Sequence, residues 1–257
     1  MFFDTHAHLD DEQFSADADE VICGLNAAGI GMYANIGSDV ESSKKSLEFA
    51  EKYPFVYAAV GIHPEFAAQT TEKDIEEIAR LAAHPKAVAI GEIGLDYHYG
   101  ADEKEAQKKW FDRQMALSAE LNMPFAIHDR EAHKDCMDII KKYDVRRTGG
   151  IMHCFSGSAE TAQQVVELGM YVGFTGVLTF KNAKKAVRAC AAVPIERLLL
   201  ETDSPYMSPE PHRGEKSESS MIRFTAARMA EIKGVSTQEM LDITARNARE
   251  LFRIGEP

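Results

Sequence analysis

Two histidines near the start of the chain have the spacing of a metal site. His6 and His8 lie in the apolar segment Phe2-Phe3-Asp4-Thr5-His6-Ala7-His8-Leu9. Side chains two positions apart on a strand point to the same face, so both imidazoles can reach one ion. A buried pair of neutral imidazoles needs polar partners, and a divalent cation is a common one. This segment alone leaves a second interpretation open, in which hydrogen bonds satisfy two core histidines.

Five later segments also place a histidine or a carboxylate at or near the end of a short apolar run. They are Gly61-Ile62-His63-Pro64, Gly91-Glu92-Ile93-Gly94-Leu95-Asp96, Ile127-His128-Asp129, Met152-His153-Cys154-Phe155 and Leu200-Glu201-Thr202-Asp203-Ser204-Pro205. Taken singly, His128 or His153 suits a hydrogen-bonded core, and Asp203 suits a turn or a helix cap. Independent core residues have no reason to share the same end of several strands. The joint occurrence therefore favours one common site.

Glu92 is the residue least easily explained by packing alone. It stands among apolar neighbours such as Ile90 and Ile93, where an unpaired buried carboxylate is costly. Its strand contains no lysine or arginine that could neutralise it. A carboxylate that bridges metal ions is the favoured interpretation.

Together these segments offer more ligands than one tetrahedral ion accepts. The candidate ligands are His6, His8, Glu92, His128, His153 and Asp203. We expect Glu92 to bridge two divalent ions. The imidazoles of His6 and His8 would hold one ion with Asp203. Those of His128 and His153 would hold the other. Two ions about 3.5–4 Å apart stabilise the attacking and leaving oxygens of a displacement.

The donor types also indicate which metals and which chemistry to expect. A mixed set of imidazoles and carboxylates suits Zn²⁺ or Mn²⁺ best, and Mg²⁺ less well. Besides binding metal, Asp203 is placed to act as general base toward a metal-bound water. We expect His63, at a neighbouring strand end, to contact the scissile group rather than the metal.

The whole chain alternates short apolar runs with amphipathic stretches. The strand candidates are Phe2–Leu9, Gly31–Gly37, Val56–His63, Ala87–Leu95, Phe125–Asp129, Gly150–Phe155, Tyr171–Thr175 and Leu198–Thr202. Eight strands, each followed by a helix, predict a (β/α)8 TIM barrel. A doubly wound open sheet is the alternative, but its first strand usually leads into a glycine-rich phosphate turn. Here the first strand leads into histidines.

The intervening stretches carry apolar residues at helical spacing. The helix candidates are Asp39–Lys52, Glu103–Leu121, Thr161–Leu168, Lys184–Ala192, Met221–Lys233 and Thr237–Arg253. No linker, low-complexity run or longer internal repeat interrupts the pattern. We therefore expect residues 1–257 to form a single domain, with its active site at the carboxyl ends of the strands.

Composition restricts the partners that the protein can have. The formal net charge of −12 disfavours broad electrostatic adhesion to nucleic acid, although bound cations would give a site its own positive charge. No apolar stretch approaches membrane-spanning length, and the first strand leaves no room for a signal peptide. The four scattered cysteines fit a reduced cytoplasm. We expect a cytoplasmic protein, with a monomer favoured.

In order and in spacing, these motifs resemble the TatD family of metal-dependent deoxyribonucleases. The resemblance extends from Phe2 to about Phe252. It implies a TIM barrel of the amidohydrolase type and a divalent-metal hydrolase that acts on DNA, commonly as an exonuclease from the 3′ end. The positions that match the family's metal ligands are the six named above. His63 matches a position expected near the substrate.

The chain departs from the family pattern at two places near the expected site. Glu65 stands where the family often has histidine after the Gly-Ile-His-Pro motif. The run Arg213-Gly214-Glu215-Lys216-Ser217-Glu218-Ser219 has Glu215 at a usually positive position and lacks a proline. Arg213 and then Arg130 are the best candidates for phosphate contacts, although both could be surface ion-pair residues.

The leading function is hydrolysis of DNA phosphodiester bonds at single-stranded or frayed ends. The first alternative keeps the same two-metal site but cleaves the ester of a D-aminoacyl-tRNA, and fold and metal site do not choose between these. The second alternative is a non-catalytic protein that retains metal, which the complete ligand set disfavours.

Overall fold

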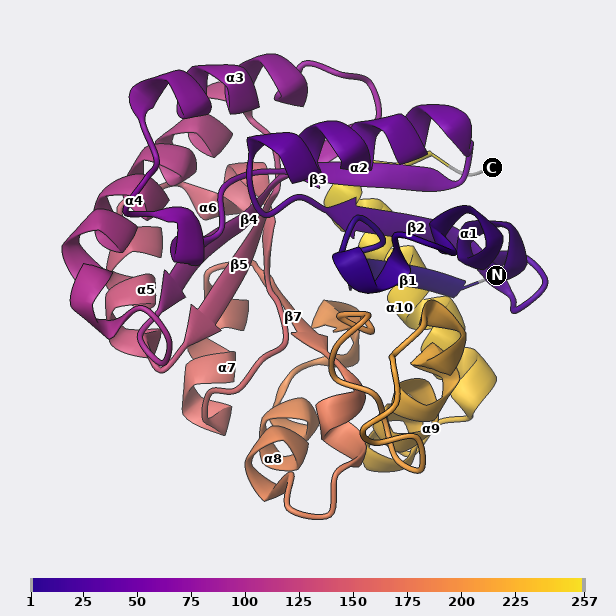
Figure 1. The fold of residues 1–257 in the computed structure, drawn as a ribbon. Helices are drawn as coiled ribbons and strands as arrows, with labels where there is room; N and C mark the ends of the chain where they lie inside the picture. The colour runs from indigo at the N-terminus through magenta and orange to yellow at the C-terminus, as the bar shows by residue number, and fades with distance from the viewer. Residues whose placement is uncertain (1, 256–257) are drawn as a thin grey trace.

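The computed structural model describes residues 2–255, in which eight parallel strands form a barrel surrounded by helices (Figure 1). Neighbouring strands pair in sequence order from β1 to β8. The strands are β1 (Phe2–Ala7), β2 (Ile30–Ile36), β3 (Val56–Val60), β4 (Ala87–Asp96), β5 (Phe125–Arg130), β6 (Gly150–Met152), β7 (Tyr171–Phe174) and β8 (Leu198–Leu200). The predicted (β/α)8 fold is confirmed.

Six of the eight strands end earlier than the apolar runs predicted, by one to three residues, and three of them matter for the site. The ladders of β3, β6 and β8 stop at Val60, Met152 and Leu200. The chain beyond them leaves the regular sheet, and both Cys154 and Asp203 have positive φ angles, of 41° and 58°. The candidate ligands that follow β6 and β8 are therefore held on short loops just past the strands, and so is the histidine after β3.

The predicted helices are present with end shifts of one or two residues, and further helices occupy stretches without a predicted range. The longer helices are α2 (Val40–Lys52), α3 (Glu72–Ala82), α4 (Lys104–Leu121), α9 (Ile222–Lys233) and α10 (Thr237–Phe252). The shorter ones are α1 (Ala18–Leu25), α5 (His133–Ile140), α6 (Val145–Thr148), α7 (Ala159–Glu167) and α8 (Lys184–Ala192). No helix within residues 2–255 is both long and apolar enough to cross a membrane.

Local sequence explains where these helices begin. Helix α2 starts after Asp39, whose carboxylate accepts the backbone N–H of Ser42 at 2.7 Å, while the Ser42 hydroxyl accepts the N–H of Asp39 at 3.0 Å. This reciprocal capping satisfies two of the free N–H groups at a helix start. It also turns the chain sharply at the carboxyl end of β2, beside the site.

The seam between β1 and β8 is closed by the segment that follows β8. The backbone N–H of Asp203 donates to the carbonyl of His6 at 2.8 Å, and that of His8 donates to Ser204 at 2.7 Å. Beneath them, the buried Asp4 carboxylate accepts the N–H and the hydroxyl of Thr202 at 3.0 and 2.6 Å. These bonds join β1 to the segment that follows β8, and they hold Asp203 beside His6.

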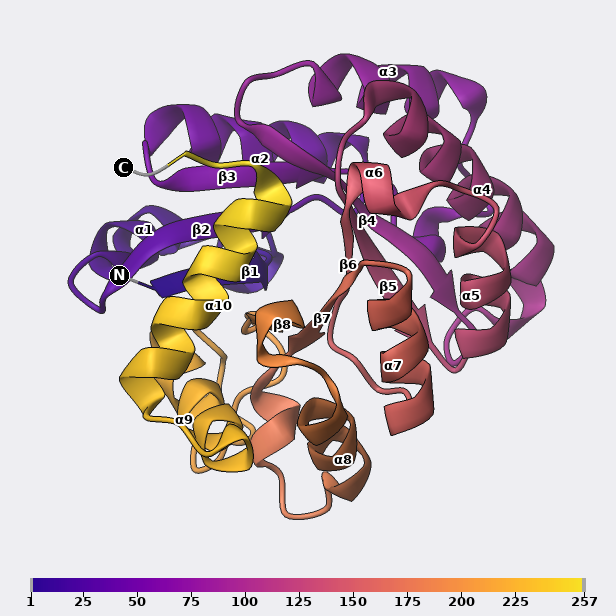
Figure 2. The same ribbon diagram turned by 180° about the vertical axis from the view of Figure 1, so that it is seen from behind.

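Helix α10 covers the other end of the barrel (Figure 2). It packs against β1 and β8, and the ring of Phe252 lies 5.7 Å from that of Phe3. Both aromatic side chains are almost fully buried. The apolar contact closes the amino-terminal end, so the open end is the one where the candidate ligands lie.

Glycines allow β4 to lie close to the end of β3 on one side and to β5 on the other, under the site. A Cβ atom at Gly61 would lie 2.7 Å from the backbone of Gly91, and one at Gly91 would lie 2.8 Å from the Ala126 side chain. No larger residue fits at either position without moving the backbone. This close approach sets where His63 and Glu92 emerge.

Candidate active site and metal centre

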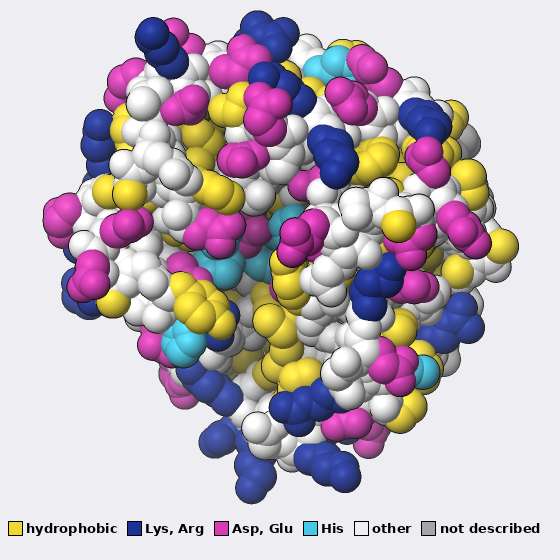
Figure 3. All heavy atoms as spheres, viewed as in Figure 1, with side chains coloured by type: hydrophobic (Ala, Val, Ile, Leu, Met, Phe, Trp, Pro, Cys, Tyr) yellow, Lys and Arg dark blue, Asp and Glu magenta, His cyan; other side chains and the backbone are white. Residues whose placement is uncertain are grey.

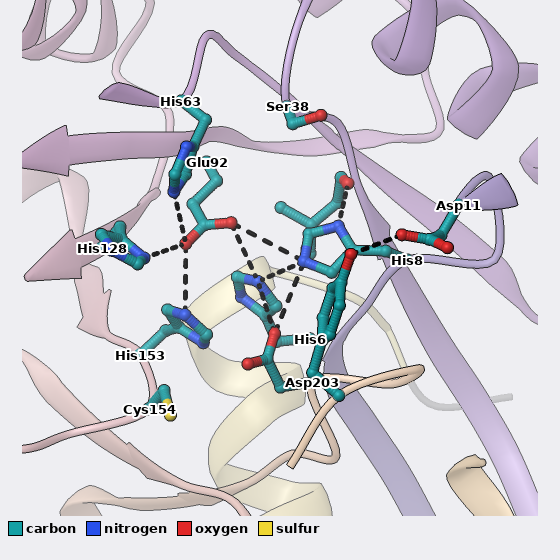
Figure 4. A network of polar contacts seen from close by, with 12 residues as sticks. His6, His8, Asp11, Ser38, His63, Glu92, His128, His153, Cys154 and Asp203 are labelled. Carbon is teal, nitrogen blue, oxygen red and sulfur yellow. Dashed lines mark hydrogen bonds and ion pairs between the residues drawn. The ribbon is translucent and has the colours of Figure 1, made fainter. Parts of the chain in front are cut away.

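All six predicted ligands meet at the carboxyl ends of the strands, at the base of an open cavity of about 810 Å³ (Figure 4). His6 belongs to β1, and His8 follows it. Glu92 lies on β4 and His128 on β5, whereas His153 and Asp203 follow β6 and β8. Each side chain is therefore aimed by a strand or by the loop just after it, which is where this fold carries its active sites.

The first group of donors surrounds one oxygen of Glu92. Nε2 of His6 lies 3.2 Å from Nε2 of His8 and 3.4 Å from Oε2 of Glu92. Nε2 of His8 lies 3.7 Å from the same carboxylate oxygen. Oδ1 of Asp203 lies 3.9 Å from His6 and 3.5 Å from His8.

These distances fit a cation better than they fit hydrogen bonds alone. Four donors at about 2.1 Å from a shared ion lie about 3.4 Å apart in a regular tetrahedron. The five separations given above, from 3.2 to 3.9 Å, cluster around that value. Two imidazole nitrogens that face each other between two carboxylates are also the donor set that Zn²⁺ or Mn²⁺ prefers.

The second group surrounds the other oxygen of Glu92. Oε1 lies 2.9 Å from Nδ1 of His128 and 3.2 Å from Nε2 of His153. Nε2 of His63 lies 4.0 Å from this oxygen. The two oxygens of one buried carboxylate thus face different sets of imidazoles, which is the arrangement expected of a bridge between two ions.

Buried charges shift the protonation of these groups. Burial opposes protonation of His8, but its hydrogen bond to Asp203 and the charge of Glu92 raise its pKa to about 9. Burial has the same effect on His128, where bonds to Asp96 and Glu92 raise the pKa to about 9. Burial opposes ionisation of Glu92, yet the surrounding imidazoles hold its pKa well below the usual value. Without a bound metal, protons on His8 and His128 therefore offset the charge of the Glu92 carboxylate.

His63 differs from the other histidines of the site. Burial and the neighbouring His128 lower its pKa to about 3, so the imidazole is neutral. Its Nδ1 accepts the backbone N–H of Glu65 at 3.2 Å, which assigns the ring proton to Nε2. That Nε2–H points toward the centre, as a hydrogen-bond donor requires.

Two carboxylates that support the ligands escaped sequence analysis. Oε1 of Glu201 lies 3.4 Å from Nδ1 of His153 and accepts the backbone N–H of Cys154. Oδ2 of Asp96 lies 3.2 Å from Nε2 of His128. Glu201 is fully buried on an apolar strand end without a cation. The argument applied to Glu92 would have found it.

The backbone is strained at two positions beside the ligands, in a way that aims their side chains. Cys154 and Asp203 adopt left-handed conformations, which are unfavourable for residues with a Cβ atom. Such strain concentrates at functional sites, where surrounding bonds maintain it. Here the Glu201 carboxylate holds the N–H of Cys154, and the His6 carbonyl holds that of Asp203.

The two candidate phosphate contacts lie at different distances from the centre. Arg130 lines the main cavity, with its guanidinium 4.6 Å from the centre of the Tyr99 ring. Arg213 is exposed and stacks 4.3 Å from the ring centre of Phe180, farther out. Within residues 2–255 neither arginine forms an ion pair with a carboxylate. Both guanidiniums are thus available to an anion.

The two departures from the family pattern also take definite positions. Glu65 lines the main cavity, with its carboxylate 3.9 Å from Nδ1 of His63. In the loop after Arg213, Glu215 pairs with His212 at 3.0 Å, and Lys216 pairs with Asp17 at 2.8 Å. The acidic residue of the loop is therefore engaged with a local partner.

Comparison with known proteins agrees with this architecture. The family model described as TatD related DNase matches residues 3–253. The chain belongs to the TatD-related DNase family. It is therefore a metal-dependent hydrolase by family, and its own residues form clusters able to hold metal.

Individual relatives cover nearly the whole chain. A Bacillus subtilis protein named "Uncharacterized metal-dependent hydrolase YabD" is 44% identical over 99% of this chain and 100% of its own length. A Citrobacter rodentium protein named "3'-5' ssDNA/RNA exonuclease TatD" is 33% identical over 98% of both chains. The crystal structure of YJJV, a TatD homologue from Escherichia coli, superposes with a TM-score of 0.93 at 30% identity, covering 99% of this chain and 98% of that one.

Proposed function

We propose that this protein is a two-metal phosphodiesterase that removes nucleotides from the 3′ end of single-stranded DNA. The observation that carries the proposal is Glu92, whose two carboxylate oxygens face two separate groups of histidines at the base of an open cavity. One group would hold an ion through His6, His8 and Asp203. The other would hold an ion through His128 and His153, and Glu92 would bridge them.

Bound Zn²⁺, Mn²⁺ or Mg²⁺ would polarise the phosphoryl group and lower the pKa of a water molecule. The side chains then have distinct tasks. The Asp203 carboxylate accepts a proton from the attacking water. The Nε2–H of His63 donates a hydrogen bond to the phosphoryl group, and Arg130 contacts a second phosphate oxygen. Hydrolysis breaks the bond between phosphorus and the 3′ oxygen of the preceding nucleotide, which takes up a proton, and leaves a 5′-phosphate on the released nucleotide.

The choice of substrate follows from charge and shape as well as from the family. The formal net charge of −12 disfavours broad adhesion to long duplexes. The names of several relatives specify single-stranded DNA or RNA and the 3′–5′ direction. A recessed site at a barrel end accepts a flexible strand end more readily than a continuous duplex. We further propose that the protein acts as a monomer in the cytoplasm, where its cysteines, all unpaired within the described residues, stay reduced.

One observation favours a second candidate, hydrolysis of D-aminoacyl-tRNA esters. Asp10, Asp11, Glu65, Asp102 and Glu103 all line the main cavity. Such an acidic wall would attract the ammonium group of an aminoacyl ester. The same metal centre would then act on a carbonyl carbon in place of phosphorus.

The deciding experiment offers both substrates to the metal-free protein reloaded in turn with Zn²⁺, Mn²⁺ or Mg²⁺. Single-stranded DNA labelled at its 5′ end should shorten stepwise, with mononucleotides as product. Release of the amino acid from D-aminoacyl-tRNA without DNA cleavage would instead select the second candidate. Absence of turnover with either substrate would leave only metal binding and reject both.

Glu92→Ala is the matched inactive control for this experiment. It should abolish turnover and lower the bound metal, because neither ion keeps its shared ligand. Metal content is measured by atomic emission on dialysed protein. Retained turnover would contradict the bridging role.

A further inference from the structure

A second cavity of about 370 Å³ opens directly beside the metal centre. It shares His128, Arg130, His153, Asp203 and Met207 with the main cavity. It extends from there toward the segment between β7 and α8. The outer wall is apolar and includes Phe155, Phe174, Leu178 and Phe180. None of the roles proposed above uses this apolar wall.

Positive charge gathers near the outer rim of this cavity, although the net charge of the protein is negative. Four cations, Lys181, Lys184, Lys185 and Arg188, occur within eight residues at the start of α8. All four are exposed, and none forms an ion pair with a carboxylate within the described residues. Arg213 joins them from the other side by stacking on Phe180. Figure 3 shows dark blue side chains at this end of the hollow, below the histidines.

The opposite side of the centre carries the reverse charge. Asp10, Asp11, Glu65, Asp102 and Glu103 line the main cavity there. In Figure 3 magenta side chains surround the upper side of the cyan histidines. A phosphate that passed beyond the centre in this direction would meet like charges, whereas one on the α8 side would meet unpaired cations.

We infer that the second cavity binds one unpaired base, that of the nucleotide on the 5′ side of the scissile phosphate. The remaining strand then continues over the cations of α8, and only the terminal nucleotide lies on the acidic side. This inference rests on the proposed function, because it assigns parts of a nucleic acid strand to surfaces around the same centre. It explains exonucleolytic action by charge: the acidic wall rejects a strand that continues past the cut.

The chemistry of the cavity matches a base better than other apolar groups. Aromatic side chains accept any base by stacking, without reading its sequence. Phe180, at the rim, has Arg213 on its ring, so a cation accompanies the aromatic surface where the strand backbone would leave. A base paired within a duplex could not enter a recess of this size beside the metal centre. The cavity therefore selects single strands.

The test uses three single-stranded DNA substrates with the same sequence and a 5′ label. One is intact, one lacks the base of the penultimate nucleotide, and one lacks the base of the terminal nucleotide. The initial rate of the first cleavage, measured as kcat/KM, should fall about tenfold when the penultimate base is missing, as expected for one lost base–aromatic stack. Removal of the terminal base should have a much smaller effect.

Phe180→Ala, measured on the same three substrates, completes a double-mutant cycle between the side chain and the base. It should slow cleavage of the intact and the terminally abasic strands by a similar factor, yet leave cleavage of the penultimate abasic strand nearly unchanged. A uniform loss over all three substrates would show a merely structural effect and overturn the inference. So would equal cleavage of all three substrates by the unmodified protein, while the proposed exonuclease function would stand.

Charge reversal tests the path of the strand. Lys184→Glu, outside the lining of the second cavity, should raise KM for strands of ten or more nucleotides and reduce the dependence of kcat/KM on salt, with little change for a dinucleotide. Lys141→Glu, just after α5, is the matched control, because Lys141 is also exposed and forms no ion pair within the described residues; this variant should behave like the unmodified protein. Equal effects of the two variants would contradict the assigned path. If the unmodified protein cleaves no strand at all, the proposed function itself fails.

Discussion

At the scale of single residues, the site depends on how each imidazole is held as well as on which residues are present. His63 is neutral and offers its Nε2–H, because its Nδ1 is occupied by the Glu65 backbone. His153 has the opposite arrangement, with Nε2 toward Glu92 and Nδ1 toward the buried Glu201. A carboxylate behind a ligating histidine orients the ring and raises its basicity. Two histidines of one site thus have different tasks.

His63→Ala should lower kcat by about 10²-fold, because a positioned donor at the scissile group is lost. Metal content should stay near that of the unmodified protein, since His63 lies 4.0 Å from the nearer Glu92 oxygen. Steady-state kinetics and metal analysis measure the two effects separately. His84→Ala, on a histidine paired with Glu51 away from the site, serves as control. Loss of metal in His63→Ala would place the residue among the ligands.

Glu201→Gln tests the support behind His153. The change removes a charge without changing size, and we expect metal affinity to fall about 10- to 100-fold, as for other partners of ligating histidines. Competition with a chromophoric chelator measures this affinity. Glu196→Gln removes the same charge from an exposed residue just before β8 and should leave affinity unchanged. Equal affinities in both variants would show that Glu201 only fills space.

At the scale of elements, the closed end of the barrel stabilises the open end. Helix α10 seals the amino-terminal side through the contact between Phe252 and Phe3. Strand β1 carries Phe3 at that end and His6 toward the other, where His8 follows it. The seam bonds from Asp4 to Thr202 then fix the loop that carries Asp203. Packing far from the chemistry therefore determines the position of the metal ligands.

Phe252→Ala should reduce the free energy of unfolding by about 3–5 kcal/mol, because it leaves a cavity against Phe3. Urea denaturation followed by circular dichroism measures the change. Phe252→Leu retains most of the apolar volume and should cost less. Under conditions where both variants remain folded, their activity should differ little from that of the unmodified protein. A loss near zero for Phe252→Ala would mean that α10 does not close the barrel tightly.

At the scale of the whole molecule, charge is distributed in a pattern that the total conceals. The formal net charge is −12, yet four cations stand together at the start of α8. Acidic residues line the main cavity on the other side of the centre. A chain of phosphates therefore meets attraction on one side and repulsion on the other. Electrostatic fields of this kind direct a substrate as well as bind it.

Protonation of the site couples metal binding to pH. In the metal-free protein the pKa values of His8 and His128 are raised to about 9. Because these pKa values are higher in the folded state than the value of 6.5 in the unfolded chain, protonation stabilises the fold. This stabilisation is complete at pH values below 6.5 and is lost as the pH rises through about 9. Metal requires the deprotonated rings, so its apparent affinity should increase over the same range.

Two measurements check this linkage. Calorimetry of metal binding at pH 7 in buffers of different ionisation enthalpy should show release of protons. Thermal unfolding of the metal-free protein should occur at lower temperature as the pH rises from 6.5 toward 9, whereas the metal-loaded protein should be less affected. Metal binding without proton release would show that the imidazoles are already neutral.

Much of the fold and of the ligand set could be predicted, because the functional side chains lie at or just after the ends of the strands. The alternation of apolar runs with helical stretches indicated the barrel, which the strand order confirms. Side-chain alternation brought His6 and His8 to one face, and the structure places their Nε2 atoms 3.2 Å apart. The cost of burying Glu92 without a cation marked it before any neighbour was known. Such inferences succeed because they depend on local periodicity and on the solvation of single groups.

Only the tertiary structure decided how distant segments meet. The separate faces of the Glu92 carboxylate, the Glu201 support behind His153 and the apolar cavity before α8 all depend on register across the barrel and on the seam between its first and last strands. Periodicity along a chain carries no information about such distances, since they are set by packing between residues up to about two hundred positions apart. The identities of the ligands could be inferred from local patterns, but their division into two groups required closure of the barrel.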